Sequence, residues 1–358
     1  MNYSPLRHIG SVVWKNDPIQ LTFFLTRKCN ARCPFCFYLS RRDAPPDPEL
    51  TLDEIRKVSA SLGKLLWLAF SGGEVFLRED LAAITKAFYE NNKPSIILLP
   101  TNGLLPDRIR EQTEAILKEC PKSTVAVKVS LDGPEEVHDS LRRVPGAFRM
   151  ALETCEKLRP LLGRYPNFEL GINTVFCSAN QGCMDGLIDF VEGLKGIRTH
   201  TVSLVRGEVA EEGLKEVDLA VYQRTIEKLE ANLKRSRIGR YRFRGSRLKT
   251  AQDILQRRLI HDTARKNERL IPCYAGKLTL VLTETGDLYP CESFTNRMGN
   301  VRDWGYDVKK LFSGSAARAA VRAVRESGCH CTHECYMMMN ILFNPARYPS
   351  LIREYRQL

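Results

Sequence analysis

The segment Leu21-Thr-Phe-Phe-Leu25 is followed after three residues by Cys29-Asn-Ala-Arg-Cys33-Pro-Phe-Cys36. The apolar run predicts a buried strand. The cysteines then lie on the loop after a strand, where α/β barrels place their reactive groups. Three thiolates at this spacing can ligate three irons of a 4Fe-4S cluster and leave the fourth iron open for chemistry. The alternatives are a zinc site or three unrelated core cysteines.

Strands and helices alternate through the first 207 residues. Further strands are predicted at 65–70, 96–99, 125–130, 170–176 and 201–206, and helices at 51–62, 78–91 and 146–158. Thr51 and Glu54 have the spacing of a capping box at the start of the first helix. This alternation predicts a parallel sheet, and therefore an α/β fold.

The cysteine loop resembles that of the radical SAM superfamily, whose fingerprint is C-x3-C-x-Φ-C with an aromatic residue, here Phe35, before the last cysteine. The resemblance implies a partial (β/α)6 TIM-like barrel over residues 19–207. It also implies that Cys29, Cys33 and Cys36 hold a 4Fe-4S cluster whose open iron binds S-adenosylmethionine. The reduced cluster would cleave this cofactor to methionine and a 5′-deoxyadenosyl radical, which takes a hydrogen atom from substrate.

Ser71-Gly72-Gly73-Glu74 follows the second predicted strand. Two glycines allow a ligand to approach the backbone, and Glu74 can accept a hydrogen bond from an ammonium group. The motif resembles the family's GGE turn, which binds the methionyl amine. Asn102, in Thr-Asn-Gly103, resembles the turn after the third strand. Both segments are also compatible with ordinary turns.

Ser130 ends the fourth predicted strand, before Leu131-Asp-Gly-Pro134 and His138-Asp-Ser-Leu-Arg142. By resemblance, Ser130 and Arg142 contact the carboxylate of S-adenosylmethionine, and an arginine facing a carboxylate is chemically sensible. Asn173 and Arg206, on the fifth and sixth strands, could reach the adenosine. The alternative is that Asp132-Gly-Pro134 is only a turn and that Arg142 is only a solvated charge on a helix.

A second cysteine group lies near the other end of the chain. Cys273 and Cys291 flank a predicted hairpin that turns at Gly286, and Cys329-His-Cys331-Thr-His333-Glu-Cys335 follows. Together with Met298-Gly-Asn-Val301, this resembles a twitch/SPASM-like domain with one auxiliary 4Fe-4S cluster. Cys273, Cys291, Cys331 and Cys335 are the first choice of ligands. Cys329 is the spare or replaces one of them. A zinc site with His330 or His333 is the alternative.

The other four cysteines (Cys120, Cys155, Cys177 and Cys183) are expected to be small buried hydrophobes. Cys177 is the candidate if a hydrogen-atom donor is needed. Thiolate clusters and the lack of a signal peptide argue against disulfides and favour the cytoplasm. Only 28 residues precede the first ligand. We therefore expect no leader-binding module of the kind that peptide-modifying relatives often carry.

The formal net charge is +12, and residues 233–270 supply +10 of it, with thirteen Lys or Arg and three acids. This basic stretch includes Arg240-Tyr-Arg-Phe-Arg244 and Arg257-Arg258. A solvated charged face is the default interpretation, and attraction of an anionic partner is the functional one. No recognition helix, RNA-binding signature or zinc finger is present, which argues against nucleic acid. The apolar run 336–343 is too short to span a bilayer, although contact with a membrane surface stays open.

The expected domains are an N-terminal segment (1–18), the barrel (19–207), a basic helical linker (208–272), a cysteine-rich β-hairpin plus helix domain (273–338) and a tail (339–358). The predicted function is radical chemistry on an anionic small-molecule, sugar or lipid substrate, with the auxiliary cluster assisting oxidation. An external one-electron reductant such as flavodoxin or ferredoxin would supply electrons. The alternatives are maturation of a ribosomally synthesised peptide and a non-catalytic iron–sulfur redox protein.

Overall fold

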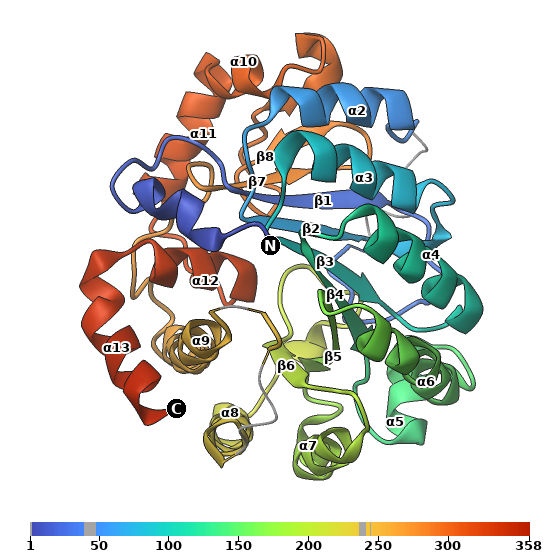
Figure 1. Ribbon diagram of the computed structural model, residues 1–358. Coiled ribbons are helices and arrows are strands. Elements are labelled where there is room, and N and C mark those ends of the chain that lie inside the picture. The colour runs from blue at the N-terminus through green and yellow to red at the C-terminus, as the bar shows by residue number, and fades with distance from the viewer. Residues whose placement is uncertain (1, 39–47, 236–240, 244) are drawn as a thin grey trace.

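A computed structural model describes residues 2–38, 48–235, 241–243 and 245–358. Its sheet has the strand order β6-β5-β4-β3-β2-β1-β7-β8-β9 within these residues. The first six strands pair in parallel in chain order, and helices cover their outer side (Figure 1). The predicted α/β fold with a partial barrel is confirmed.

The first six strands are β1 (Gln20–Thr26), β2 (Trp67–Gly72), β3 (Ile96–Thr101), β4 (Thr124–Ser130), β5 (Phe168–Phe176) and β6 (Thr199–Leu204). The helices among and after them are α2 (Leu52–Ser61), α3 (Leu81–Asn92), α4 (Pro106–Glu119), α5 (Glu135–Arg142), α6 (Ala147–Arg164), α7 (Met184–Gly193), α8 (Leu219–Arg235) and α9 (Ser246–Lys266). The remaining elements are β7 (Thr279–Leu282), β8 (Asp287–Tyr289), β9 (Gly299–Asn300), α10 (Val308–Phe312), α11 (Ser315–Glu326), α12 (Glu334–Leu342) and α13 (Tyr348–Gln357). Short 3₁₀ helices include η1 (Pro5–Val12), η2 (Val75–Leu77) and η5 (Val301–Trp304).

The core lies between the sheet and its outer helices. In β1, Leu21, Phe23 and Leu25 belong to this core together with Ile84 and Phe88 of α3. Side chains alternate along a strand, so the residues between them face the interior of the barrel. This alternation directs polar groups at the strand ends towards one mouth of the barrel.

Two local predictions can be checked in detail. The capping box is present, because the Thr51 side chain accepts from the Glu54 N–H and the Glu54 carboxylate accepts from the Thr51 N–H. The helix expected at 78–91 begins only at Leu81. The short helix η2 ends at Leu77, and Arg78 pairs with Asp80 ahead of the first turn of α3.

The C-terminal hairpin continues the barrel sheet. β7 pairs in parallel with β1, and β8 and β9 follow in antiparallel order. Gly286 makes the hairpin turn with a φ of +92°, a conformation that glycine adopts without strain. One sheet therefore runs across the boundary expected at residue 273.

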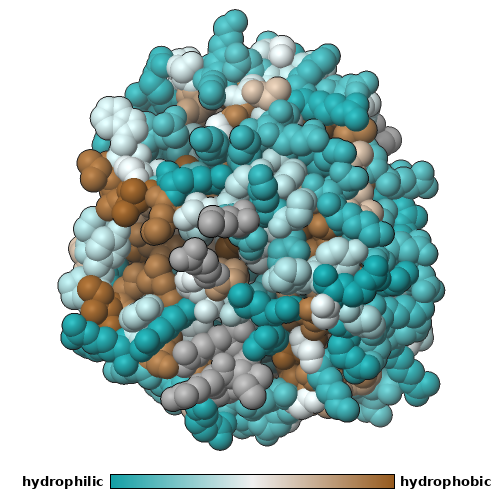
Figure 2. Space-filling view, viewed as in Figure 1, coloured by the Kyte–Doolittle hydropathy of each residue, from teal (hydrophilic) through white to brown (hydrophobic). Residues whose placement is uncertain are grey.

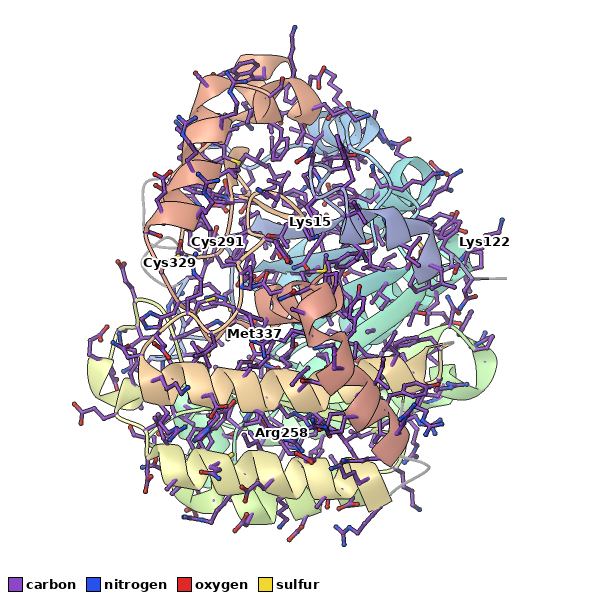
Figure 3. All side chains as sticks on the ribbon, turned by 90° about the vertical axis from the view of Figure 1, so that its left-hand side faces the viewer. Lys15, Lys122, Arg258, Cys291, Cys329 and Met337 are labelled. Atoms are coloured by element: carbon purple, nitrogen blue, oxygen red, sulfur yellow. The ribbon has the colours of Figure 1, made fainter. Side chains whose placement is uncertain are left out.

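The open side of the barrel is covered by α8, α9, α12 and α13, which lie together in Figure 3. Arg258 of α9 links three of these helices, because it pairs with Glu230 of α8 and with Glu354 of α13 at 2.8 Å. Within the linker expected at 208–272, the long described elements are the helices α8 and α9. Arg240 and Arg244, two arginines of the basic stretch, lie outside the described residues.

Hydrophilic side chains cover most of the face in Figure 2, and apolar ones gather on its left. On that side of Figure 1 lies η1, and Leu6, Ile9, Val13 and Trp14 in and after it are exposed. Among the described residues, no helix has the length and apolar character needed to cross a membrane.

Candidate active site

The three cysteines of the first loop lie together after β1. The Cys36 N–H donates to the Cys33 carbonyl at 3.1 Å, which turns the loop back on itself. Burial raises the pKa of the Cys33 thiol to about 11, and the nearby Cys36 and Cys29 thiols add to this effect while Arg142 opposes it. The three sulfur atoms therefore share one buried environment in which a cationic group would favour their thiolate form.

The Gly-Gly-Glu turn is bound to this loop through its backbone. The Gly73 N–H donates to Thr26 O at 2.7 Å, and the Glu74 N–H donates to Lys28 O at 2.9 Å. A Cβ on Gly72 would lie 2.4 Å from Thr26 O, and one on Gly73 would lie 2.1 Å from Lys28 O. Any side chain at these two positions would collide with the chain leading to Cys29, and the expected approach of a ligand to their backbone stays a prediction.

The carboxylate of Glu74 is buried and fixed by three donors. Thr101 Oγ1 donates at 2.9 Å, the Asn102 N–H at 2.7 Å and the Phe76 N–H at 3.2 Å. Burial nonetheless raises the pKa of Glu74 to about 7. A bound cation would favour the ionised form, so this carboxylate is suited to an ammonium group.

Asn102 connects the carboxylate with the cysteines. Its Nδ2 lies 3.8 Å from Cys29 Sγ and donates to Asn30 Oδ1 at 2.7 Å. Glu74, Asn102 and Cys29 therefore come together at one end of the sheet, as the sequence predicts.

Arg142 lies on the other side of the cysteine loop and is almost fully buried. Its Nη2 and Nε contact Asp132 Oδ2 at 2.6 and 2.7 Å, and its Nη1 donates to Cys33 Sγ at 3.8 Å. Its guanidinium also lies 5.3 Å from the centre of the Phe35 ring. Arg142 is not the solvated charge of the alternative interpretation.

The rest of the His-Asp-x-x-Arg motif shapes the loops around this pair. The Asp132 N–H donates to His138 Nδ1 at 3.0 Å, and burial lowers the pKa of His138 to about 4. Asp139 accepts from the N–H groups of Gly146 and Phe148 at 2.6 and 2.8 Å. These two side chains therefore act on the backbone rather than on a ligand.

Ser130 and Asn173 are partners in the register of β4 and β5, and both are half-buried. Arg206, just after β6, turns towards the C-terminal segment. Its Nε donates to His333 Nδ1 at 2.9 Å and its Nη1 donates to Glu334 at 3.2 Å. We expected Arg206 at the adenosine, but its described partners belong to the second cysteine group.

Arg206 also contacts the first cysteine loop, since its guanidinium lies 5.6 Å from the centre of the Phe37 ring. The neighbouring Glu292 is buried and lies 3.4 Å from His333 Nδ1. This cluster of Arg206, His333, Glu292 and Glu334 was missed from the sequence. The one signal for it is that Glu292 and Glu334 are adjacent in sequence to the proposed ligands Cys291 and Cys335.

Burial raises the pKa values of the C-terminal thiols Cys291, Cys331 and Cys335. The pKa of Cys291 is raised chiefly by burial, with contributions from Cys273 and Cys329. That of Cys331 is raised to about 12 by burial, with contributions from Cys273 and Cys291. For Cys335 the main contributions after burial come from Glu292 and Glu334.

The positions of the cysteines determine whether the two cysteine groups can bind a single metal ion or an iron–sulfur cluster. In the part of the chain that the structure describes, no three His, Cys, Asp or Glu side chains converge closely enough to bind a single metal ion. A 4Fe-4S cluster is larger and presents one iron to each thiolate. Both cysteine groups supply the soft sulfur donors that such a cluster prefers, so the residues fit it.

The remaining cysteines behave as small core residues. Cys120, Cys155 and Cys177 are buried, and Cys183 is half-buried. Burial raises the pKa of Cys177 to about 11, which keeps its thiol protonated.

Comparison with known proteins agrees with this geometry. Residues 23–172, from β1 into β5, match the family model described as "Radical SAM superfamily". The AdoMet-dependent heme synthase of Methanosarcina barkeri is 28% identical over 306 residues, which cover 82% of each chain. The subtilosin biosynthesis protein AlbA of Bacillus subtilis is 30% identical over 161 residues, 43% of this chain and 34% of its own.

Among solved structures, anSMEcpe with bound AdoMet has a TM-score of 0.60 at 18% identity, covering 95% of this chain and 96% of its own. This likeness concerns the fold. The matched domain contains the three-cysteine loop, the Gly-Gly-Glu turn and the Arg142–Asp132 pair. Residues 23–172 therefore form a radical SAM domain, which implies S-adenosylmethionine and a 4Fe-4S cluster.

Proposed function

We propose that the protein cleaves S-adenosylmethionine reductively and abstracts a hydrogen atom from an anionic small molecule, with an auxiliary cluster assisting oxidation of the substrate. The observation that carries the proposal is the position of Glu74. Its buried carboxylate is held by Thr101 and by the N–H of Asn102, whose side chain reaches Cys29. This is the arrangement needed to bind an ammonium group beside an open iron.

The proposed site residues have the following parts. Cys29, Cys33 and Cys36 would ligate the cluster, and Glu74 would accept hydrogen bonds from the methionyl ammonium. Arg142 would supply positive charge next to the Cys33 thiolate. Ser130, which ends β4, would contact the carboxylate of the cofactor. When bound, the reduced cluster and S-adenosylmethionine supply the deoxyadenosyl radical.

The second cysteine group would hold the auxiliary cluster. Cys273, Cys291, Cys331 and Cys335 are the first choice of ligands, and Cys329 is the spare or replaces one of them. An external flavodoxin or ferredoxin would supply electrons, and a reducing compartment such as the cytoplasm would keep the thiols free.

The proposed substrate class comes from the heme synthase, whose match to this chain is longer than that of AlbA. The heme synthase of Methanosarcina barkeri resembles this chain over 82% of both. Haem carries carboxylate side chains, so an anionic tetrapyrrole is the first compound to test. In the anaerobically reconstituted enzyme with a reductant, a tetrapyrrole that carries carboxylate side chains should be consumed as 5′-deoxyadenosine is released.

The second candidate is peptide maturation. AlbA, named for subtilosin biosynthesis, supports it, although this chain spans only 34% of AlbA. In the same assay a precursor peptide would replace the tetrapyrrole. Release of 5′-deoxyadenosine that depends on the peptide and does not occur with the tetrapyrrole would favour peptide maturation. It would overturn the proposal that the substrate is an anionic small molecule.

A further inference from the structure

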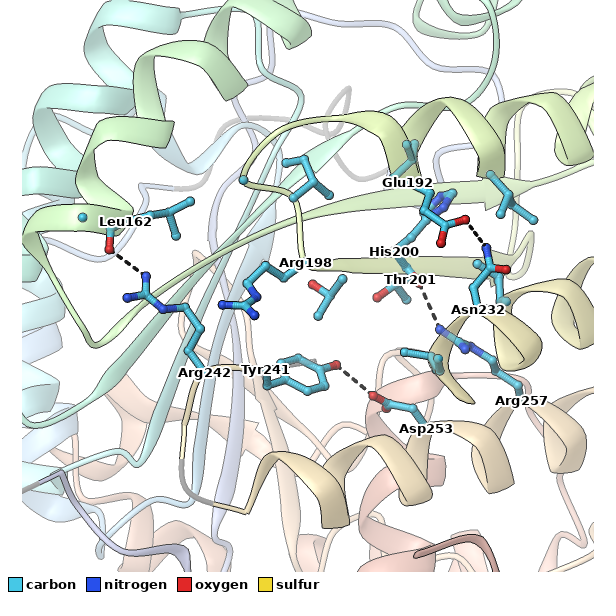
Figure 4. Close-up of a pocket in the computed structure, with 18 residues that line it drawn as sticks. Leu162, Glu192, Arg198, His200, Thr201, Asn232, Tyr241, Arg242, Asp253 and Arg257 are labelled. Carbon is cyan, nitrogen blue, oxygen red and sulfur yellow. Dashed lines mark hydrogen bonds between the residues drawn. The ribbon is translucent and has the colours of Figure 1, made fainter. Parts of the chain in front are cut away.

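A cavity of about 530 Å³ lies at the start of β6, between the end of α6, α7, α8 and α9 (Figure 4). The volume is in the range of small-molecule sites. Thr199, at its wall, begins β6, whereas Arg206 follows the other end of the strand. At about 3.3 Å per strand residue, the cavity is about 20 Å from the mouth that holds the cysteines.

One wall of the cavity is apolar. Ile188 and Val191 of α7 and Leu229 and Leu233 of α8 contribute to it. The opposite wall is polar and comes from β6, from residues 241–242 and from the first half of α9. A ligand that fills this space therefore needs an apolar body and a polar end.

The two arginines Arg242 and Arg257 of the polar wall donate to neutral carbonyl groups, and Glu169 accepts from the backbone N–H of Arg242. Arg242 Nη1 donates to the carbonyl of Leu162 at 2.8 Å, and Arg257 Nη2 donates to the carbonyl of His200 at 2.9 Å. These acceptors are neutral, so neither guanidinium gives up its charge to a carboxylate by these bonds. Arg198 lines the cavity beside them.

The acids of the cavity are already satisfied by other groups. Asp253 accepts from the Tyr241 hydroxyl at 2.8 Å and pairs with Lys249. Glu192 accepts from Asn232 Nδ2 at 2.8 Å. They therefore do not neutralise the two arginines directly.

Two buried atoms at the same wall have no hydrogen-bond partner: Arg257 Nη1 and His200 Nδ1. Leaving a buried donor without a partner is costly, and more so when it carries charge. Burial lowers the pKa of His200 to about 3, so its ring is neutral at physiological pH. The Arg257 Nη1 atom has almost no accessible surface, so a ligand oxygen accepts from it only after the side chain turns towards the cavity.

We propose that this cavity is a second ligand site, which binds a carboxylate or phosphate carried on an apolar body through Arg242 and Arg257. The site lies outside the radical chemistry proposed above and does not depend on it. It assigns part of the basic stretch at 233–270 to one binding function. Arginine suits this role because its planar guanidinium matches both oxyanions.

The test uses the full-length protein and 8-anilinonaphthalene-1-sulfonate, a fluorescent probe with an apolar body and one anionic group. Octanoate and octyl phosphate should displace the probe, whereas n-octanol, which lacks the charge, should not. Whichever acid competes better identifies the oxyanion. Equal displacement by n-octanol would show a merely apolar site and overturn the proposal.

The variants separate charge from volume. R257Q and R242Q should each weaken octanoate and octyl phosphate binding about tenfold or more, the loss expected for one charge-assisted hydrogen bond. R265Q changes an exposed residue of α9, the helix that carries Arg257, and should leave the affinity for both acids within about twofold of the wild-type value. Unchanged affinity in both R257Q and R242Q would overturn the proposal.

A steric pair guards against a folding defect in the arginine variants. Gly163 lines the cavity, and a Cβ built on it meets no atom within 4 Å. G163L should narrow the space and weaken binding of both acids about tenfold, while G163A should bind as the wild type does. Undiminished binding by G163L would place the ligand elsewhere.

Discussion

Arg142 binds Asp132 through Nη2 and Nε, at 2.6 and 2.7 Å, directly beneath the three-cysteine loop. Asp132 is fully buried and also accepts from the Val175 N–H at 2.9 Å. The ion pair therefore connects two parts of the site: Asp132, after β4, bonds to β5 through Val175, and Arg142 bonds to the Cys33 sulfur. Its role is to hold the loop and to place positive charge beside a thiolate.

Replacing Arg142 with Met should leave the Asp132 carboxylate buried and unpaired. We expect the free energy of unfolding to fall by about 3–5 kcal/mol, as for other broken buried pairs. Urea unfolding of the anaerobic protein measures this. The control is R143M, whose exposed partner is Glu211 and whose loss should cost below about 1 kcal/mol. An equally small loss in R142M would contradict the structural role.

Replacing Glu74 with Gln should weaken binding of S-adenosylmethionine. The neutral amide keeps the shape but loses the charge that attracts the ammonium, so we expect Kd to rise at least about tenfold. Iron content should stay at the wild-type level, because Glu74 is not a proposed ligand. Calorimetric titration of the reconstituted protein gives Kd, with the exposed Glu79→Gln as control. Unchanged affinity in E74Q would remove Glu74 from the cofactor site.

Glu54 links α2 to the C-terminal segment. Its carboxylate accepts from Arg302 Nε at 2.8 Å and from the Tyr306 hydroxyl at 2.9 Å. The hydrogen bond from Arg302 is the main cause that lowers the pKa of Glu54 from 4.5 to about 2. The folded state therefore binds this proton less readily than the unfolded state does.

It follows that the stabilisation from Glu54 is complete above about pH 4.5 and is lost as the pH falls towards 2. E54Q should lower the free energy of unfolding by about 2 kcal/mol at pH 7, and the difference from wild type should shrink below pH 4. Urea unfolding at several pH values measures it, with Asp53→Asn, an exposed change, as control. A difference that stayed constant down to pH 2 would exclude this linkage.

Replacing Cys291 with Ala should remove a ligand of the auxiliary cluster but leave the radical site intact. Release of 5′-deoxyadenosine should continue, while conversion of substrate stops. The buried Cys120 provides the control, since C120A should change neither. Product formation by C291A at the wild-type rate would rule out a redox role for the second group.

The sheet could be predicted from the sequence because strands buried on both faces appear as short apolar runs. The start of α3 could not, since Arg78-Glu-Asp80 has residues that a helix accepts, but Arg78 is extended and Asp80 only precedes the first turn. Glu74, Asn102 and Cys29 could be placed together because parallel strands end at the same edge of the sheet.

Other parts of the site depend on contacts that are distant in sequence. His333 is 127 residues from Arg206, and no local pattern reveals that they meet. Likewise, the sequence alone does not show whether a ligand or another part of the backbone lies beside Gly72 and Gly73. The glycines were found, but the reason for them required the position of Lys28 O.

The central claim is that Cys29, Cys33 and Cys36 hold the cluster that cleaves S-adenosylmethionine. The most direct measurement is reductant-dependent release of 5′-deoxyadenosine by the anaerobically reconstituted protein and its C33A variant, with iron and sulfide determined per chain. We predict release and about eight irons for the wild type, counting four per cluster, and no release with about four fewer irons for C33A. Release of 5′-deoxyadenosine by C33A at the wild-type rate would contradict the assignment.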